Sequence, residues 1–197
     1  MVSKLQLAVQ EVCLNAIENS ESKETIGKLL EHYYEINAGI GVHKSPKLYG
    51  AFPTDPYSHT PSNKGAQQPG MTGQVKEDII SRFGELGVFV NKGKIYFNPC
   101  LLLKNEFIQE ERMFHYVTVN KEHKTFSPQP GSICFTFCQV PIIYKLSDEN
   151  YLEIEKSNGE CRQLKSLELD EATSKSIFDR TAEISKITVY INESILK

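Results

Sequence analysis

The sequence predicts an α+β protein, with helices in its first part and an antiparallel sheet or small sandwich in its second part. Two observations carry this prediction. Apolar residues recur with helical spacing up to residue 87, and from residue 88 apolar and polar residues alternate as they do in strands. Because the period changes there, we expect a helical part at 1–87 and an antiparallel β-domain at 88–197.

Three segments of the helical part have the pattern of amphipathic helices. Residues 2–18 place one apolar stripe on a helix, formed by Leu5, Val9, Val12, Ala16 and Ile17. A second helix at 23–36 can be capped by Ser20 or Ser22, and a third at 73–86 can be capped by Thr72. We therefore expect an αα-hairpin, then a long loop at 39–71, then the third helix.

The β-domain is predicted from alternating segments separated by tight turns. "VFV" and "KIYF" surround "NKG", which is a good hairpin signal. Further strands are expected in "FHYVTVNKEHKTF", "SICFTFCQVPIIYKL", "NYLEIEKSNGECRQL" and "EISKITVYIN". Between the last two, "SLELDEATSKSIF" resembles a strand, a capped turn and a short helical piece.

Composition excludes several classes of function. The chain has 197 residues, of which 24% are charged, and a net charge of −3 with single, scattered basic residues. Nucleic acid is therefore not an expected partner. No stretch approaches the roughly 20 apolar residues of a membrane span, and the N-terminus lacks the apolar core of a signal peptide. We expect a cytoplasmic protein without membrane contact.

Metal and cofactor sites are not expected either. The five cysteines are irregularly spaced, and no CxxC or HxxxH occurs, so we interpret Cys134 and Cys138 as packed thiols. The sequence also lacks the Walker A, GxGxxG, HExxH and GxSxG motifs, which argues against nucleotide-loop, zincin and α/β-hydrolase chemistry.

The candidate site is the loop and helix start at 49–78. It combines rings and amides in a proline-rich segment that cannot form a helix or a strand. Amides, carboxylates and rings are the groups that recognise sugar hydroxyls and ring faces, so we expect a carbohydrate ligand. A disordered linker is the alternative reading of residues 39–71.

Each candidate residue has a functional and a structural reading. Glu77 and Asp55 are the candidate catalytic carboxyls, because glycoside hydrolysis usually uses a pair of them. The candidate substrate-binding residues are Tyr57, His59, Gln67, Gln68, Gln74 and Lys76. In the structural reading Glu77 only complements the helix dipole, Asp55 is a turn residue before a proline, and His59 bonds within the loop.

Residues 49–107 carry a resemblance to a known class of enzyme. The stretch "YGAFPTDPYSHTP…GAQQPGMTGQVKEDIISRFGELG", followed by Gly93, Ile95, Phe97 and Pro99 in a G-x-I-x-F-x-P segment, resembles the carboxyl-terminal end of (α/α)6-toroid carbohydrate-active enzymes. These include inverting glycoside hydrolases and glycoside phosphorylases. The resemblance implies a pocket-lining loop, a final helix and an appended β-domain.

A full toroid has more helical hairpins than this chain supplies, so three readings remain open. The chain is a fragment of an enzyme, a small relative that only binds, or half of a site completed by a partner chain. The second reading makes it a non-catalytic carbohydrate-binding or protein-interaction module. An open toroid edge would also expose apolar helix faces, which predicts self-association.

Overall fold

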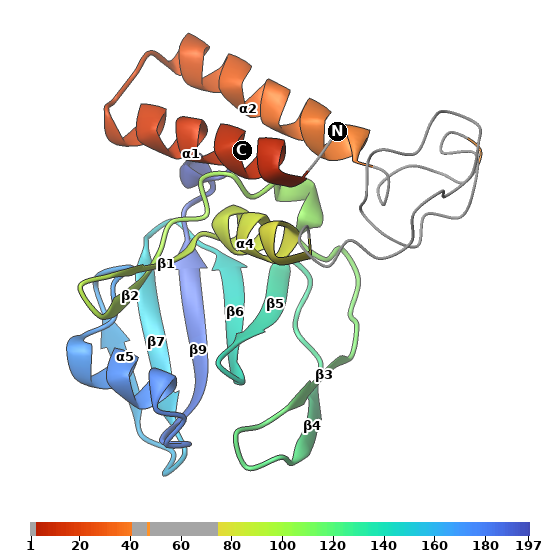
Figure 1. The fold of residues 1–197 in the computed structure, drawn as a ribbon. Helices are drawn as coiled ribbons and strands as arrows, with labels where there is room; N and C mark the ends of the chain where they lie inside the picture. The colour runs from red at the N-terminus through yellow and green to blue at the C-terminus, as the bar shows by residue number, and fades with distance from the viewer. Residues whose placement is uncertain (1–2, 41–46, 48–74) are drawn as a thin grey trace. The chain divides into compact units, whose positions relative to one another are not determined.

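The computed structural model describes residues 3–40, 47 and 75–197 (Figure 1). The chain divides into two compact units, Met1–Gly84 and Glu85–Lys197. The division falls inside helix α4, which spans Val75–Leu86, so the end of that helix belongs to the second unit.

The first unit contains the predicted αα-hairpin. Helix α1 spans Ser3–Glu18 and helix α2 spans Lys23–Gly39, and the two pack against each other. Ser22 caps α2, because its side chain accepts a hydrogen bond of 3.1 Å from the backbone N–H of Thr25. The hairpin predicted from the sequence is therefore confirmed.

The buried face of α1 differs from the sequence prediction. Leu5 and Val12, which the apolar stripe would place inside, are 44% and 50% exposed. The buried residues of this helix are Ser3, Gln6, Gln10, Cys13 and Ala16. A polar face can be buried here because Gln6 and Gln10 find hydrogen-bond partners on the neighbouring helices.

Two separate hairpins begin the second unit. Strands β1 (Val88–Asn91) and β2 (Lys94–Phe97) pair antiparallel around the turn that "NKG" predicts. Strands β3 (Phe114–Val117) and β4 (His123–Phe126) form another two-stranded sheet. A short 3-10 helix at Lys104–Glu106 lies between the hairpins in the chain, and another at Glu193–Ile195 ends it.

The largest sheet has five strands in the order β5-β6-β9-β7-β8. The strands are β5 (Ser132–Phe137), β6 (Val140–Leu146), β7 (Tyr151–Lys156), β8 (Cys161–Leu164) and β9 (Ile184–Ile191). Helix α5 (Glu171–Phe178) lies between β8 and β9 in the chain. The sequence predicts an antiparallel sheet, but β6 and β9 pair in parallel, so the sheet is mixed.

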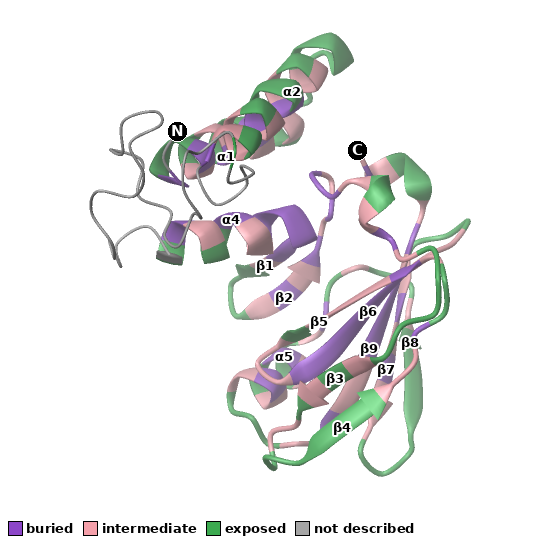
Figure 2. Ribbon diagram, turned by 90° about the vertical axis from the view of Figure 1, so that its right-hand side faces the viewer, coloured by how far each residue is buried: buried purple, intermediate pink, exposed green. Residues whose placement is uncertain are grey.

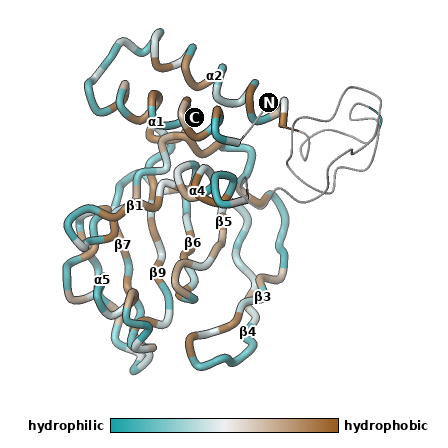
Figure 3. Tube along the Cα trace, viewed as in Figure 1, coloured by the Kyte–Doolittle hydropathy of each residue, from teal (hydrophilic) through white to brown (hydrophobic). Residues whose placement is uncertain are grey.

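One face of the five-stranded sheet forms the core of the second unit. Ile142 pairs with Ile187, and Tyr144 pairs with Val189, and all four side chains are buried. Figure 2 shows buried stretches along the central strands of this sheet. Figure 3 shows hydrophobic residues along β6, β9 and β7 and hydrophilic residues at the strand ends. Burying this apolar face is the main stabilising contribution expected for such a unit.

Side chains from β2 and α5 extend this core. Ile95 and Phe97 of β2 and Ile177 of α5 are almost completely buried. The ring of Tyr144 meets Phe97 edge-on at 6.1 Å, and its hydroxyl donates a hydrogen bond to the backbone oxygen of Leu86. Burial raises the pKa of the Tyr144 hydroxyl well above its ordinary value.

The α+β class predicted from the sequence is confirmed, with helices first and strands after them. In the described parts of the chain, no helix is both long and apolar enough to cross a membrane.

Candidate functional site

The residues predicted to form the carbohydrate site are divided between described and undescribed segments. Asp55, Tyr57, His59, Gln67, Gln68 and Gln74 lie outside the described residues. Lys76 and Glu77 both lie in the first turn of α4, where Lys76 is exposed and Glu77 is buried, with 8% of its surface accessible.

Glu77 lies on the face of α4 that meets α1. Ser81 and Gly84 follow it on that face at helical spacing. The Nε2 atom of Gln10 donates a hydrogen bond of 2.8 Å to the backbone oxygen of Ser81, and a Cβ atom on Gly84 would lie 2.1 Å from Oε1 of Gln10. The missing side chain at Gly84 therefore makes room for the glutamine.

A tyrosine joins this polar contact from the second helix. Tyr33 of α2 is fully buried, and its hydroxyl oxygen accepts hydrogen bonds from Nε2 of Gln6 at 3.1 Å and of Gln10 at 3.0 Å. This cluster was not predicted, because the apolar stripe expected for residues 2–18 does not include Gln6 or Gln10. Their spacing of four residues, which puts both on one helix face, was the available signal.

Three buried polar atoms border this cluster without a partner in the described part of the chain. They are Ser3 Oγ, Glu77 Oε2 and Ser81 Oγ. Buried polar atoms in proteins are nearly always hydrogen-bonded, so a water molecule or a ligand hydroxyl is expected at the Glu77 carboxylate. Glu77 therefore has a buried acceptor that no described side chain or backbone group satisfies.

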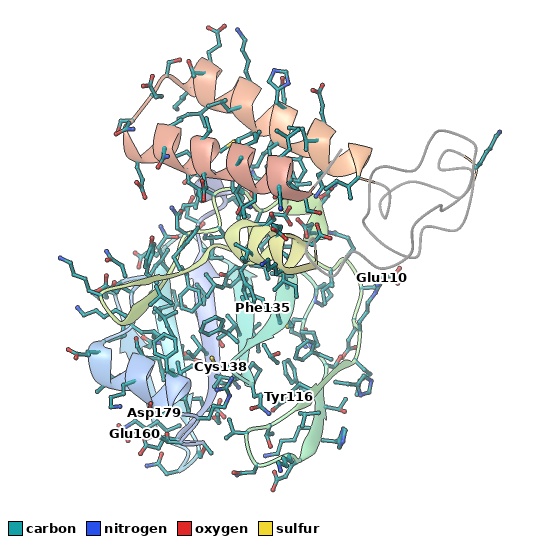
Figure 4. All side chains as sticks on the ribbon, viewed as in Figure 1. Glu110, Tyr116, Phe135, Cys138, Glu160 and Asp179 are labelled. Atoms are coloured by element: carbon teal, nitrogen blue, oxygen red, sulfur yellow. The ribbon has the colours of Figure 1, made fainter. Side chains whose placement is uncertain are left out.

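The second unit contains a polar pocket between the β3–β4 hairpin and one end of the five-stranded sheet. Its volume is about 80 Å³. The hairpin side is lined by Tyr116, Thr118, Val119, Asn120, Glu122 and Lys124. The sheet side is lined by Gln139, Pro141, Ser157, Ala182, Ile184 and Ser185. Figure 4 labels Tyr116 on β3 and Cys138 in the turn next to Gln139.

Hydrogen bonds connect and order the segments that line this pocket. The Nε2 atom of Gln139 donates to the backbone oxygen of Thr118 at 3.2 Å, which connects the sheet side to the hairpin side. Within the hairpin, Thr118 Oγ1 accepts from the backbone N–H of Glu122. On the sheet side, Ser185 Oγ donates to the backbone oxygen of Glu155 at 2.9 Å.

The charges of the pocket lining compensate each other. Glu122 and Lys124 form an ion pair of 3.4 Å, and both side chains are more than half exposed. An exposed pair of this kind contributes little to stability, so both groups can exchange partners. The remaining lining residues are neutral, which gives the pocket an aromatic ring, amides and hydroxyls without net charge.

Several backbones around the pocket are left-handed without being glycine. Lys121, Cys138, Gln139 and Ala182 have φ values of 63°, 48°, 67° and 64°. Such conformations cost about 1–3 kcal/mol each when they are strained, and Ser20, Lys92 and Arg180 adopt them elsewhere in the described residues. The sequence analysis placed no site here, because the lining comes from segments far apart in the chain.

The face of the five-stranded sheet opposite Tyr144 and Val189 has a pair of tyrosines that could form a ligand-binding surface. Tyr151 and Tyr190 stack with their ring centres 4.1 Å apart, and Lys145 Nζ lies 5.8 Å from the Tyr190 ring centre. Burial, together with the nearby Glu153 carboxylate, raises the pKa of the Tyr190 hydroxyl. Because the rings cover each other, this pair stabilises the strand pairing rather than offering a flat platform.

Cys134, Cys138 and Cys161 are free thiols. Cys134 is partly buried, and desolvation raises its pKa to about 11 despite the opposing effect of Lys145. A thiol in this environment is a poor nucleophile at neutral pH. In the described residues, no group of three or more His, Cys, Asp or Glu side chains is arranged to hold a metal ion.

Among the described residues of the first unit, the large apolar side chains that are exposed are Leu5, Val12, Ile79 and Ile80. Self-association, or completion by a partner chain, stays a prediction for these helices.

No protein-family model matches the chain, and a search among curated proteins finds no significant match.

Proposed function

We propose that the protein binds carbohydrate, and that the pocket of the second unit takes a hydroxylated edge of a neutral saccharide. The observation that carries this proposal is the lining of that pocket. A tyrosine ring, two amides, several hydroxyls and one carboxylate converge there, and these groups suit the alternating donors and acceptors of a sugar.

Size and charge support a limited class of ligand. Pockets that enclose drug-sized ligands usually measure about 300–1,000 Å³. This pocket is much smaller, at about 80 Å³, so it would take an edge or an end of a saccharide and leave the rest outside. Because Glu122 and Lys124 compensate each other, a neutral ligand is favoured over a phosphate or a nucleotide.

An NMR titration tests this proposal directly. The protein is titrated with maltose, cellobiose, lactose and trehalose at millimolar concentrations, with inorganic phosphate as the charged comparison. We expect amide shifts to concentrate at Thr118, Asn120 and Gln139 with at least one disaccharide. Shifts with phosphate alone, or none at these residues with any disaccharide, would contradict the proposal.

A second candidate function is glycosidase-like catalysis, as the toroid resemblance implies. The observation that favours it is the buried, unpartnered Oε2 atom of Glu77, which could accept or deliver a proton at a glycosidic oxygen. This role needs a second carboxyl or an activated water, for which Asp55 is the candidate from the sequence.

Substitution of the glutamate separates the two functions. We expect Glu77→Gln to abolish release of p-nitrophenol from p-nitrophenyl glycosides, while saccharide shifts at the pocket of the second unit persist. Glu31→Gln, the same change at an exposed glutamate of α2, is the matched control and should keep the wild-type rate. Turnover that survives Glu77→Gln, or its absence in the wild-type protein, rules out this candidate.

A further inference from the structure

The β5–β6 turn is built from residues that are poorly suited to it. Phe137 pairs with Val140, which leaves Cys138 and Gln139 as a two-residue loop with φ values of 48° and 67°. Two-residue loops with positive φ at both positions strongly favour Asn and Gly. The two-residue β1–β2 turn has glycine at its second position, Gly93, after Lys92 at φ 49°, and the longer β7–β8 turn has Gly159 as its positive-φ residue, whereas the β5–β6 turn has no glycine.

The Gln139 side chain makes a contact that glycine could not make. Its Nε2 atom donates to the backbone oxygen of Thr118, which lies at the turn of the β3–β4 hairpin. That oxygen also accepts from the backbone N–H of Lys121. The hairpin forms its own two-stranded sheet, so no ladder of backbone hydrogen bonds fixes it to the five-stranded sheet. Its position relative to that sheet depends on side-chain contacts such as this one.

We infer that Gln139 is a positioning residue. The left-handed turn at Cys138 and Gln139 directs the Gln139 side-chain amide toward the backbone oxygen of Thr118 in the β3–β4 hairpin. The bond from Gln139 to Thr118 fixes the distance between the two walls of the pocket. The ligand-binding consequence rests on the proposed function, whereas the positioning of the hairpin does not.

Four variants separate backbone strain from the side-chain contact. Cys138→Gly relieves strain and keeps the amide. Gln139→Met keeps the strain and the side-chain length but removes the donor. Gln139→Gly removes both strain and donor. Lys92→Gly removes the backbone strain of a left-handed residue, with φ 49°, in the β1–β2 turn. Because this turn lies outside the pocket, the variant is the control.

Hairpin order is the first readout, because it needs no ligand. We expect NMR order parameters of the amides at 118–122 to stay near the rigid value of about 0.85 in Cys138→Gly and Lys92→Gly. They should fall toward about 0.6 in Gln139→Met and Gln139→Gly. The melting temperature should rise by about 3 °C in Cys138→Gly and Lys92→Gly, because glycine adopts positive φ without strain.

Affinity for the disaccharide with the largest shifts, among maltose, cellobiose, lactose and trehalose, is the second readout. We expect about tenfold weaker binding in both Gln139 variants and no change in the other two. Wild-type order and affinity in Gln139→Met would overturn the inference. If no disaccharide binds the wild-type protein but hairpin order still falls in Gln139→Met, the proposed function fails and the positioning role stands.

Discussion

Gly87 follows α4 at a position where a side chain has no room. Its φ is +69°, and a Cβ atom there would lie 2.2 Å from the carbonyl carbon of Asn98. Both strain and overlap with backbone atoms would result, so we expect Gly87→Ala to lower the free energy of unfolding by about 2–4 kcal/mol. The measurement is urea denaturation followed by circular dichroism.

Gly93→Ala is the matched control for that substitution. Gly93 has a similar φ of +78°, but a Cβ atom there would meet no atom within 4 Å. Gly93→Ala should therefore lower the free energy of unfolding by only about 1 kcal/mol, because alanine is less favourable than glycine in a left-handed backbone. Equal losses in the two variants would show that the contact with Asn98 has no effect.

At the level of single residues, the sequence predicted glycine positions better than buried faces. Gly87 was recognisable as a helix end, because glycine after an amphipathic segment is a common cap. The inward orientation of Gln6 and Gln10 was not predictable from hydropathy, since it depends on Tyr33 of another helix. The Cys138–Gln139 turn was not predicted, because the apolar alternation runs through it and it lacks the glycine or asparagine that usually marks a tight turn.

Among the elements, α5 depends on Asp170, the residue that caps its N-terminus. The Asp170 carboxylate accepts a hydrogen bond of 2.8 Å from the backbone N–H of Thr173 and one of 2.8 Å from Nη1 of Arg162. The bond from Thr173, together with the positive charge of Arg162, lowers the pKa of Asp170 below its ordinary value. We expect Asp170→Ala to lower the free energy of unfolding by about 1–2 kcal/mol at pH 7.

The stabilising effect of Asp170 should depend on pH in a defined direction. Because the pKa is lower in the folded state than the usual value of about 3.9, the stabilisation is fully present above that value. It is lost as the pH falls through the folded-state pKa. Denaturation of wild type and Asp170→Ala from pH 7 down to pH 2 measures this. A difference at pH 2 as large as the one at pH 7 would contradict it, and Asp170→Asn, which keeps an uncharged cap, should lie between the two at pH 7.

Strands were predicted more completely than their pairing. Alternation located β1, β2, β7 and β9, and "SNG" located the β7–β8 turn. The parallel pairing of β6 with β9 could not be predicted, because alternation gives the faces of a strand but not its neighbour. The pocket was missed for the same reason, since its lining combines β3–β4 with residues near the start of β9.

For the whole molecule, the division into two units locates the proposed binding function. Every residue that lines the pocket belongs to the unit Glu85–Lys197, as does the core face of the five-stranded sheet. The predicted catalytic residues Asp55 and Glu77 belong to the other unit. Saccharide binding and any glycosidase activity are therefore expected to separate when the chain is cut.

A fragment of residues 75–197 tests this separation. It keeps α4 intact and contains the whole second unit. We expect it to unfold in a single cooperative transition and to bind the same disaccharide with the affinity of the full chain, because the pocket walls and their hydrogen bonds are all present. Gln139→Met in the fragment should weaken binding as it does in the full chain. If the fragment keeps its far-UV circular dichroism signal, loses its near-UV signal and binds the hydrophobic dye ANS, it is a molten globule. That outcome would mean that the second unit packs its core only when the helices α1 and α2 are present.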